Sequence, residues 1–475
     1  MDLLLKERTM YDVIVLGAGP AGANAALEAA DNGLKTLLLD EQKVAGGQVW
    51  RAKSKSILKA PSTEASEKGD ELRTKINQSA IEVKFNSRVW HIEKQDDDTW
   101  LMASDAEQLT AKALIIATGS QERIIPTQGW TLPGVIGLGG ATVLFKEHMM
   151  VPGRRTVVAG NGPLVFLVAS EIIRLKGTVA AVVSLNNRID WLKALPSMLS
   201  NPSLAWQGFK WIFKLYKMRV PVFWQHGINK IEGKEKVEGV TVIKVDHNWH
   251  KSDQAEQYIP AESVCYGHGL MPAIEATRLA GADHHYDELL GGWVPTIDKY
   301  GRTSVSNLYA CGDNAGILGV SVAPMRGRMA ALAVLEDLTG KKHNKKDLKI
   351  FDKAKKIGLA ATALSIPRSG LQSFITKDTE VCRCECISRR EIEHEIKTGA
   401  LSPNAVKSGT RCGMGPCGGR YCSESLALIT QHISKKTRSE IGLSTARSPL
   451  RPVALDDISN EIDYDKLPIP GVSPL

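Results

Sequence analysis

The stretch YDVIVLGAGPAGANAALEAADNGLKTLLLDE, residues 11–41, decides the fold of this chain. Residues 11–16 are mostly apolar and β-branched, which is typical of a buried parallel strand. A glycine-rich turn follows, and then an alanine-rich segment of helical character that ends at Gly33. A second apolar run occupies residues 34–39. The stretch therefore predicts a strand–helix–strand unit with a right-handed crossover.

The glycine turn has the spacing of a dinucleotide-binding loop. Gly17 allows the tight turn, Gly19 lets the backbone approach a pyrophosphate, and Gly22 permits close packing of the helix on the strand. The N-terminus of the helix then offers free N–H groups and its dipole to the phosphates. Asp40, at the end of the second strand, is placed to accept ribose hydroxyls, with Glu41 as the alternative. The predicted site residues of this unit are Gly17, Gly19, Pro20, Ala21, Gly22, Asp40 and Glu41.

This loop alone would suit FAD or NAD, and three later stretches favour FAD. Residues 46–48 (GGQ) follow the second strand, where a flavoprotein with two dinucleotide folds brings its backbone to the flavin. Residues 117–119 (ATG) end a later strand, and residues 312–313 (GD) precede a helix, which suits an aspartate that binds the ribityl chain. The FAD site is therefore expected to include also Gly47, Gln48, Val89, Ala117, Thr118, Gly119, Gly312 and Asp313.

A second strand–helix–strand unit begins near residue 155, but its glycine motif is incomplete. Gly160 and Gly162 have the expected spacing, whereas Val165 stands where the third glycine belongs. The next strand ends at residues 184–187 (SLNN), with neither an acid for a ribose nor an arginine cluster for a 2′-phosphate. We therefore expect a structural remnant or a site for another nucleotide, with a working NAD(P)H site as the alternative.

Six of the eight cysteines crowd into residues 382–422. In a reducing compartment such clustering indicates metal or cluster ligation rather than disulfides. The predicted ligands are Cys382, Cys384, Cys417 and Cys422, with Cys386 and Cys412 as the substitutes. Four thiolates suit zinc or an iron–sulfur cluster, and a redox cluster is the more useful partner for a flavin. Between the two halves of the set, residues 388–398 predict a short helix capped by Ser388 and Glu391.

Charge and hydropathy limit the partners and the compartment. The formal net charge is +8, but the basic residues are scattered and no nucleic-acid-binding module is recognisable, so no nucleic acid is expected. No run of eighteen apolar residues and no signal-peptide pattern is present, which predicts the cytoplasm, with the inner face of the cell membrane as an alternative place. Residues 190–218 predict a helical pair over a sheet, with a membrane-surface or subunit-docking helix as the alternative.

The order of these motifs resembles the flavoproteins of the thioredoxin reductase and glutathione reductase class. The chain lacks the cysteine pair that disulfide reductases carry near the position of Gly47, so disulfide reduction is disfavoured. The C-x-C pair with a distant second pair resembles the bacterioferritin-associated ferredoxin type of [2Fe-2S] module. That module usually closes with two intervening residues, whereas four separate Cys417 from Cys422.

The combination resembles a narrower family over nearly the whole chain. It comprises the FAD and [2Fe-2S] subunits of three enzymes, namely the B subunit of hydrogen cyanide synthase, the A subunit of the octopine or nopaline (opine) oxidases, and the alpha subunit of hydroxyproline or dye-linked proline dehydrogenases. The stretches that carry the resemblance are 129–135 (GWTLPGV), 289–295 (LLGGWVP) and 410–417 (TRCGMGPC). It implies a partner FAD subunit of the amino-acid-oxidase type, sometimes a small ferredoxin-like third subunit, and an acceptor such as a quinone.

The predicted fold class is α/β, with a second Rossmann domain inserted into the first and a small α-helical cysteine module at the C-terminal end. The expected divisions are 1–125 and 266–345 for the FAD domain, 126–265 for the insert, 346–379 for a linker and helix, 380–432 for the module and 433–475 for a tail.

The expected function is electron transfer in a heteromeric dehydrogenase or oxidase that acts on CH–NH or CH–NH2 groups, without a catalytic residue of its own assigned to this chain. Two alternatives remain open. One is a self-contained NAD(P)H-dependent reductase, and the other is a zinc-bearing interaction protein with a vestigial flavin fold.

Overall fold

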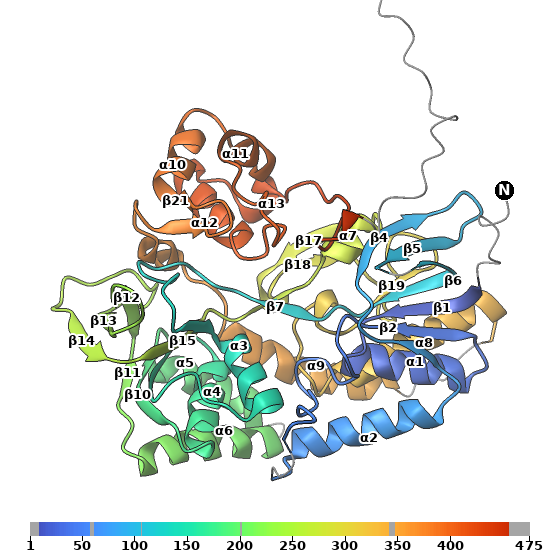
Figure 1. Ribbon diagram of the computed structural model, residues 1–475, viewed down its shortest axis with the longest axis horizontal. Coiled ribbons are helices and arrows are strands. Elements are labelled where there is room, and N and C mark those ends of the chain that lie inside the picture. The colour runs from blue at the N-terminus through green and yellow to red at the C-terminus, as the bar shows by residue number, and fades with distance from the viewer. Residues whose placement is uncertain (1–8, 58–60, 106, 200–201, 342–346, 456–475) are drawn as a thin grey trace, which may run out of the picture.

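The computed structural model describes residues 9–57, 61–105, 107–199, 202–341 and 347–455. Two α/β units lie side by side, and a smaller unit, rich in helices, packs against them (Figure 1). This arrangement confirms the predicted fold class, because the second α/β unit interrupts the first in the chain.

The first α/β unit holds the glycine turn at the end of its central strand. Its elements are β1 (Met10–Leu16), α1 (Pro20–Asp31), β2 (Thr36–Leu39), α2 (Glu64–Gln78), β3 (Glu82–Lys84), β4 (Val89–Lys94), β5 (Trp100–Ser104), β6 (Gln108–Ile116), β7 (Ser120–Glu122), β16 (Leu270–Pro272), α7 (Glu275–Leu279), β17 (His284–Asp287), β18 (Gly292–Pro295), β19 (Leu308–Ala310) and α8 (Ala323–Thr339). The main sheet runs in the order β3-β2-β1-β6-β5-β4, and β19 pairs with β6. In register, Val15 lies between Leu38 and Ile115, all on parallel strands.

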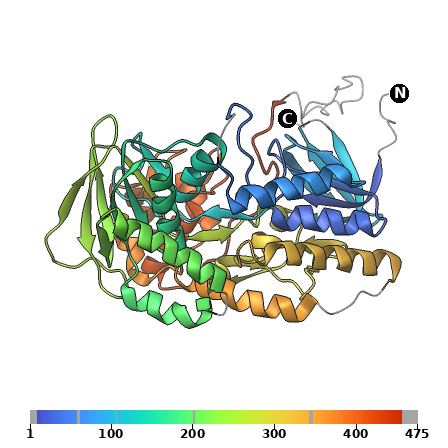
Figure 2. The same ribbon diagram turned by 90° about the horizontal axis from the view of Figure 1, so that it is seen from below.

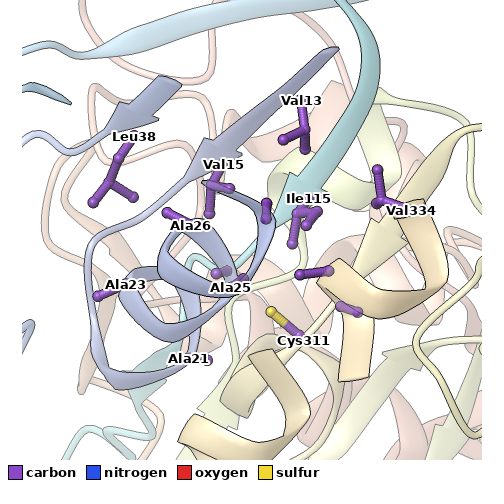
Figure 3. Close-up of a cluster of buried hydrophobic side chains, with 14 of the residues drawn as sticks. Val13, Val15, Ala21, Ala23, Ala25, Ala26, Leu38, Ile115, Cys311 and Val334 are labelled. Atoms are coloured by element: carbon purple, nitrogen blue, oxygen red, sulfur yellow. The ribbon is translucent and has the colours of Figure 1, made fainter. Parts of the chain in front are cut away.

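Helices α1 and α8 lie side by side against one face of this sheet (Figure 2). The approach is close, because a Cβ on Gly327 of α8 would lie 1.9 Å from the carbonyl oxygen of Ala21. Small alanines on α1 and branched residues such as Val13 and Ile115 fill the space between helix and sheet (Figure 3). The alanine-rich sequence after the glycine turn is therefore explained by helix packing.

The second unit is inserted after β7. Its elements are β8 (Val135–Gly137), α3 (Leu138–Val143), a π-helical turn (Leu144–His148), β9 (Arg155–Gly160), α4 (Pro163–Arg174), β10 (Thr178–Ser184), α5 (Arg188–Leu199), α6 (Pro202–Lys217), β11 (Val222–Trp224), β12 (His226–Glu232), β13 (Gly239–Lys244), β14 (Gln257–Pro260) and β15 (Ser263–Gly267). A parallel sheet runs β11-β10-β9-β15-β8, and β12-β13-β14 form a separate antiparallel sheet. The expected boundary after residue 265 falls inside β15, so we propose that the insert ends after Gly267.

The third unit follows α9 (Asp347–Ala363). Its elements are β20 (Glu380–Cys382), β21 (Ile387–Ser388), α10 (Arg389–Lys397), α11 (Pro403–Thr410), α12 (Ser423–Ser434) and α13 (Arg438–Ile441). The helical prediction omitted the short hairpin of β20 and β21, which a C-x-C stretch does not signal. The predicted cap is confirmed, since Ser388 and Glu391 form a capping box at the start of α10.

Candidate functional site

The glycine turn leaves an open cradle at the N-terminus of α1. Gly17 has a φ of 107°, and a Cβ there would lie 2.4 Å from the carbonyl oxygen of Ala117. A Cβ on Gly22 would lie 1.8 Å from the carbonyl oxygen of Gly17, so both positions need glycine for packing. Gly19 is different, because among the described residues the nearest atom to its Cβ position is the Cα of Gly47 at 3.9 Å. The free N–H groups of the helix end therefore meet an open space that fits a pyrophosphate.

Residues 46–48 close this cradle from the other side. A Cβ on Gly47 would lie 2.9 Å from the Cα of Gly19, so the two backbones nearly touch. The side-chain oxygen of Gln48 accepts a hydrogen bond from Arg51 at 2.9 Å. The loop is thus held where its backbone can reach a ligand that lies on the helix end.

A half-buried lysine from the inserted unit fixes the same loop. The Lys146 Nζ donates to the carbonyl oxygens of Gln48 and Val49, both at 3.0 Å, and burial lowers the pKa of Lys146 to about 8. Beside it, Glu147 pairs with Arg51 at 2.7 Å. Sequence reasoning missed Lys146 because it lies 98 residues from Gln48 along the chain and belongs to no motif.

The two acids at the end of β2 have different surroundings. Asp40 is buried, and its two carboxylate oxygens accept backbone N–H groups of Ala18 at 2.5 Å and Gln42 at 2.7 Å. Burial raises the pKa of Asp40. Glu41 is exposed and pairs with Arg451 at 3.1 Å. Because both carboxylate oxygens of Asp40 already accept backbone N–H groups, we propose that Glu41 is the acid that binds the ribose.

The turn at Gly312 and Asp313 lies against the start of α1. A Cβ on Gly312 would lie 2.8 Å from the Cβ of Ala21. One carboxylate oxygen of Asp313 accepts N–H groups of Leu318 and Gly319, both at 3.2 Å. The turn is therefore in reach of the same cradle, as the predicted ribityl-binding role requires.

The remaining predicted residues fall in two places. Ala117 packs on the glycine turn, and Thr118 and Gly119 each hydrogen-bond the backbone of Ala273, at 2.8 and 3.0 Å. Val89 is buried on β4, in a different hydrophobic cluster from Ala117. Its backbone follows the segment that pairs with the end of β2, and its place in the FAD site stays a prediction.

The phosphate position of the second nucleotide fold is filled by the chain itself. The backbone N–H of Gly162 donates to the side-chain oxygen of Asn186 at 2.9 Å. The amide nitrogen of Asn186 in turn donates to the carbonyl oxygen of Leu364 at 3.1 Å. A Cβ on Gly162 would lie 2.2 Å from the hydroxyl of Ser365. The segment after α9 thus lies against the glycine turn, where a pyrophosphate would otherwise bind.

The third unit gathers sulfur ligands. Cys382, Cys412 and Cys422 are buried, and their Sγ atoms all lie within 4.8 Å of one another. Cys384 and Cys417 interact through their side chains beside this group. The structure therefore brings the four predicted ligands together and adds Cys412, one of the two substitutes.

The other substitute is separate, because Cys386 is exposed on the turn between β20 and β21. The loop between Cys412 and Cys422 is rich in glycine. A Cβ on Gly415 of this loop would lie 2.3 Å from the Cβ of Cys384. Several thiolates on tight glycine loops fit an iron–sulfur cluster. We propose Cys382, Cys384, Cys417 and Cys422 as its ligands.

A cavity of about 750 Å³ lies between the cysteine unit and the first α/β unit. One wall is the loop of residues 412–420, and the opposite wall includes Gln121 and Met271, close to Thr118 and Gly119. The charged side chains of its lining are mainly basic and include Arg278, Lys407, Arg411, Arg420, Arg438 and Arg451. The cavity therefore borders the loop of the cysteine unit on one side and, on the other, β7 and β16 beside Thr118 and Gly119.

A buried carboxyl on β7 gives the fold a measurable pH dependence. Glu122 accepts an N–H of Gly139 at 3.0 Å, its other oxygen is enclosed without a partner among the described residues, and burial raises its pKa from 4.5 to about 8. The stability gained from the protonated form is fully present below pH 4.5 and is lost as the pH rises to about 8. Glu122→Gln should therefore stabilise the protein at pH 8.5 by up to about 4 kcal/mol and change little near pH 5.

Denaturant midpoints at the two pH values test this expectation. Glu67→Gln, on the exposed face of α2, is the control and should leave the pH profile unchanged. Equal profiles for wild type and Glu122→Gln would show that the Glu122 carboxyl is not protonated in the folded protein.

Comparison with known families agrees with both sites. Residues 11–333 match the family model for pyridine nucleotide-disulphide oxidoreductases, and residues 380–431 match that for BFD-like [2Fe-2S] binding domains. Together with the cradle and the cysteine group, these matches show that the chain binds FAD and a [2Fe-2S] cluster. Among the described residues no helix has both the length and the apolar character to span a membrane.

Known proteins match both units together. The A subunit of opine oxidase from Rhizobium meliloti is 33% identical over 95% of this chain and 88% of its own length, and the HcnB subunit of hydrogen cyanide synthase from Pseudomonas protegens is 28% identical over 93% and 96%. L-Proline dehydrogenase from P. horikoshii shares the fold, with a TM-score of 0.71 and 23% identity over 96% of this chain and 80% of that one. The chain therefore belongs to the pyridine nucleotide-disulphide oxidoreductase family and, through a match that spans the flavin fold and the cysteine unit alike, to the family of the opine oxidase A subunit.

Proposed function

We propose that this chain is the electron-transferring FAD and iron–sulfur subunit of a heteromeric amino-acid or opine dehydrogenase. A C–N bond is oxidised on a partner subunit that carries its own FAD and is of the amino-acid-oxidase type. Electrons then pass through this chain to an acceptor such as a quinone, and a small ferredoxin-like subunit is a further proposed partner. The names of the two relatives, which belong to an opine oxidase and a hydrogen cyanide synthase, support this donor class.

The observation that carries the proposal is the filled phosphate position of the second nucleotide fold. Beyond the contacts of Leu364 and Ser365, the same segment is fixed by Arg368, which pairs with Asp190 at 2.9 Å and lies over the ring of Trp249. A coenzyme pyrophosphate would have to displace Ser365 and the Asn186 side chain from the N-terminus of α4. This arrangement favours electron entry from another protein over reduction by NAD(P)H.

The position of the cavity supports the relay. FAD, when bound, exchanges electrons in pairs or singly, whereas a [2Fe-2S] cluster exchanges them singly. The chain holds the surroundings of both centres in place. Lys146 and Arg51 fix the loop at Gln48. The glycine loop of the cysteine unit lines the same cavity as Gln121. The FAD site and the cluster site thus belong to one polypeptide chain.

The proposal predicts that NADH and NADPH do not reduce the flavin. In anaerobic stopped-flow mixing of the purified chain with either coenzyme, the flavin absorbance should persist for minutes, while dithionite should bleach it. Bleaching by NADH at rates of 1 per second or faster, typical of enzymes at about 1–1,000 per second, would instead establish the self-contained reductase.

Reconstitution with a partner supplies the positive test. The chain is mixed with a co-encoded FAD-dependent oxidase-type protein and a panel of amino acids and opines. One member of the panel should bleach the flavin of this chain only when the partner is present. Reduction of this chain by an amino acid without the partner would contradict the division of labour.

A further inference from the structure

Helix α6 carries a row of aromatic side chains on its outer surface. Trp206, Phe209, Phe213 and Tyr216 have exposed fractions of 57, 55, 54 and 81%. Their spacing of three or four residues places them along one face of the helix. Trp206 stacks on Phe209 with ring centroids 5.5 Å apart, and Phe209 stacks on Phe213 at 6.0 Å. We call these four residues the aromatic row.

The opposite face of α6 accounts for the packing of the helix. Leu215 is fully buried against α4, and the Lys214 Nζ donates to the carbonyl oxygen of Ser170 at 3.0 Å. Figure 2 shows α5 and α6, in green, along the outer surface of the inserted unit. The aromatic row is therefore not required to hold the helix in place, and contiguous exposed apolar surface of this kind marks an interaction site.

Basic residues outnumber acidic ones in the segment that carries the aromatic row. Between residues 188 and 219 the chain has six lysines and arginines and a single acid, Asp190, which is buried and paired with Arg368. Lys210 lies over the ring of Trp206 at 5.6 Å, and Lys217 is exposed about two turns further along. Glu64 of α2 acts on Lys210 from a neighbouring element, but it is already paired with Lys68 at 2.7 Å. The exposed face of α6 thus combines the aromatic row with two lysines, Lys210 and Lys217.

We propose that the aromatic row of α6 docks on an anionic lipid bilayer, with the helix lying in the plane of the interface. Tryptophan and tyrosine are the side chains that favour the headgroup level of a membrane. Flanking lysines extend to the lipid phosphates while their methylene stems stay on the apolar side. The charge of the surface selects an acidic bilayer over a zwitterionic one. The inference stands apart from the proposed electron relay, because binding is measured without an electron donor.

The test is co-sedimentation of the intact FAD- and cluster-loaded chain with vesicles. Vesicles of phosphatidylcholine with phosphatidylglycerol should carry the protein down at low salt, and binding should fall as salt is raised. Vesicles of phosphatidylcholine alone should bind it at least about tenfold more weakly, because each basic residue near an anionic surface adds to the attraction. Equal binding to both kinds of vesicle, or to neither, would overturn the proposal.

Two pairs of variants locate the contact. Trp206→Ser with Phe213→Ser removes apolar area, and Lys210→Glu with Lys217→Glu reverses charge. Either pair should weaken binding to the anionic vesicles by about tenfold or more. The matched controls are Tyr258→Ser with Leu289→Ser, at positions exposed to 53 and 46%, and Lys234→Glu with Lys236→Glu on the loop after β12.

The controls should bind as the wild type does, and flavin content should be unchanged in all variants. If the controls lose as much binding, the contact is not at α6. If instead the aromatic-row variants dissociate a dimer or a complex with the partner subunit while vesicle binding persists, the surface is a protein interface and the proposal is wrong.

Discussion

Replacing Cys417 by serine is expected to leave a chain that retains FAD and has lost its iron. Cys417 interacts with Cys384 beside the three sulfurs that lie within 4.8 Å of one another, so a serine there removes one of four proposed ligands. Hydroxyl oxygen is a poor replacement for thiolate on iron. The iron content and the broad visible absorption of the cluster should fall to near zero, while the flavin bands persist.

Two further substitutions make this measurement specific. Cys386→Ser changes an exposed cysteine outside the group and should keep the cluster. Cys412→Ser should also keep it, because the proposed ligand set leaves Cys412 as a neighbouring thiol. Loss of iron in Cys412→Ser together with its retention in Cys417→Ser would transfer the ligand role to Cys412.

Gly19→Val is expected to produce the reverse phenotype, a chain with its cluster but without FAD. The backbone of Gly19 has φ −68° and ψ −178°, an extended conformation that any residue adopts, and its Cβ position meets no described atom closer than 3.9 Å. A valine side chain would therefore enter the cradle without disturbing the fold. Because it would occupy the space of the pyrophosphate, the flavin content should fall to near zero.

A glycine elsewhere provides the comparison for this variant. Gly208 lies in α6, and a Cβ there would meet no described atom within 4 Å. Gly208→Ala should keep both FAD and iron, as measured by absorption and iron assay. Normal flavin content in Gly19→Val would mean that the phosphates do not lie on the N-terminus of α1.

Local sequence patterns predicted the parts of this protein that depend on near neighbours. The buried strands, the glycine turn and the capping box at Ser388 and Glu391 each arise within about thirty residues of chain, so spacing alone identifies them. The fold class followed because two strand–helix–strand units in order imply two parallel sheets.

Contacts between distant segments could not be predicted in this way. Lys146 reaches the loop at Gln48, Arg451 reaches Glu41, and Ser365 reaches Gly162, in each case across about a hundred residues or more. No periodicity or motif marks these residues, since their roles come from the packing of whole units. The spacing of the cysteines also could not decide whether Cys412 lies near the proposed ligands. Only the folded loop places its sulfur beside those of Cys382 and Cys422.

Residues 364–368, which lie against the second glycine turn, limit how a coenzyme site could arise there. If an ancestor bound a coenzyme there, restoring the missing glycine at Val165 would not return that ability, because Ser365 and Arg368 also anchor the stretch that leads to the cysteine unit. Coenzyme binding would also require residues 364–368 to move away from the glycine turn. The segment that leads to the iron–sulfur unit would then lose these contacts. A single substitution at Val165 is thus not expected to create a coenzyme site at this turn.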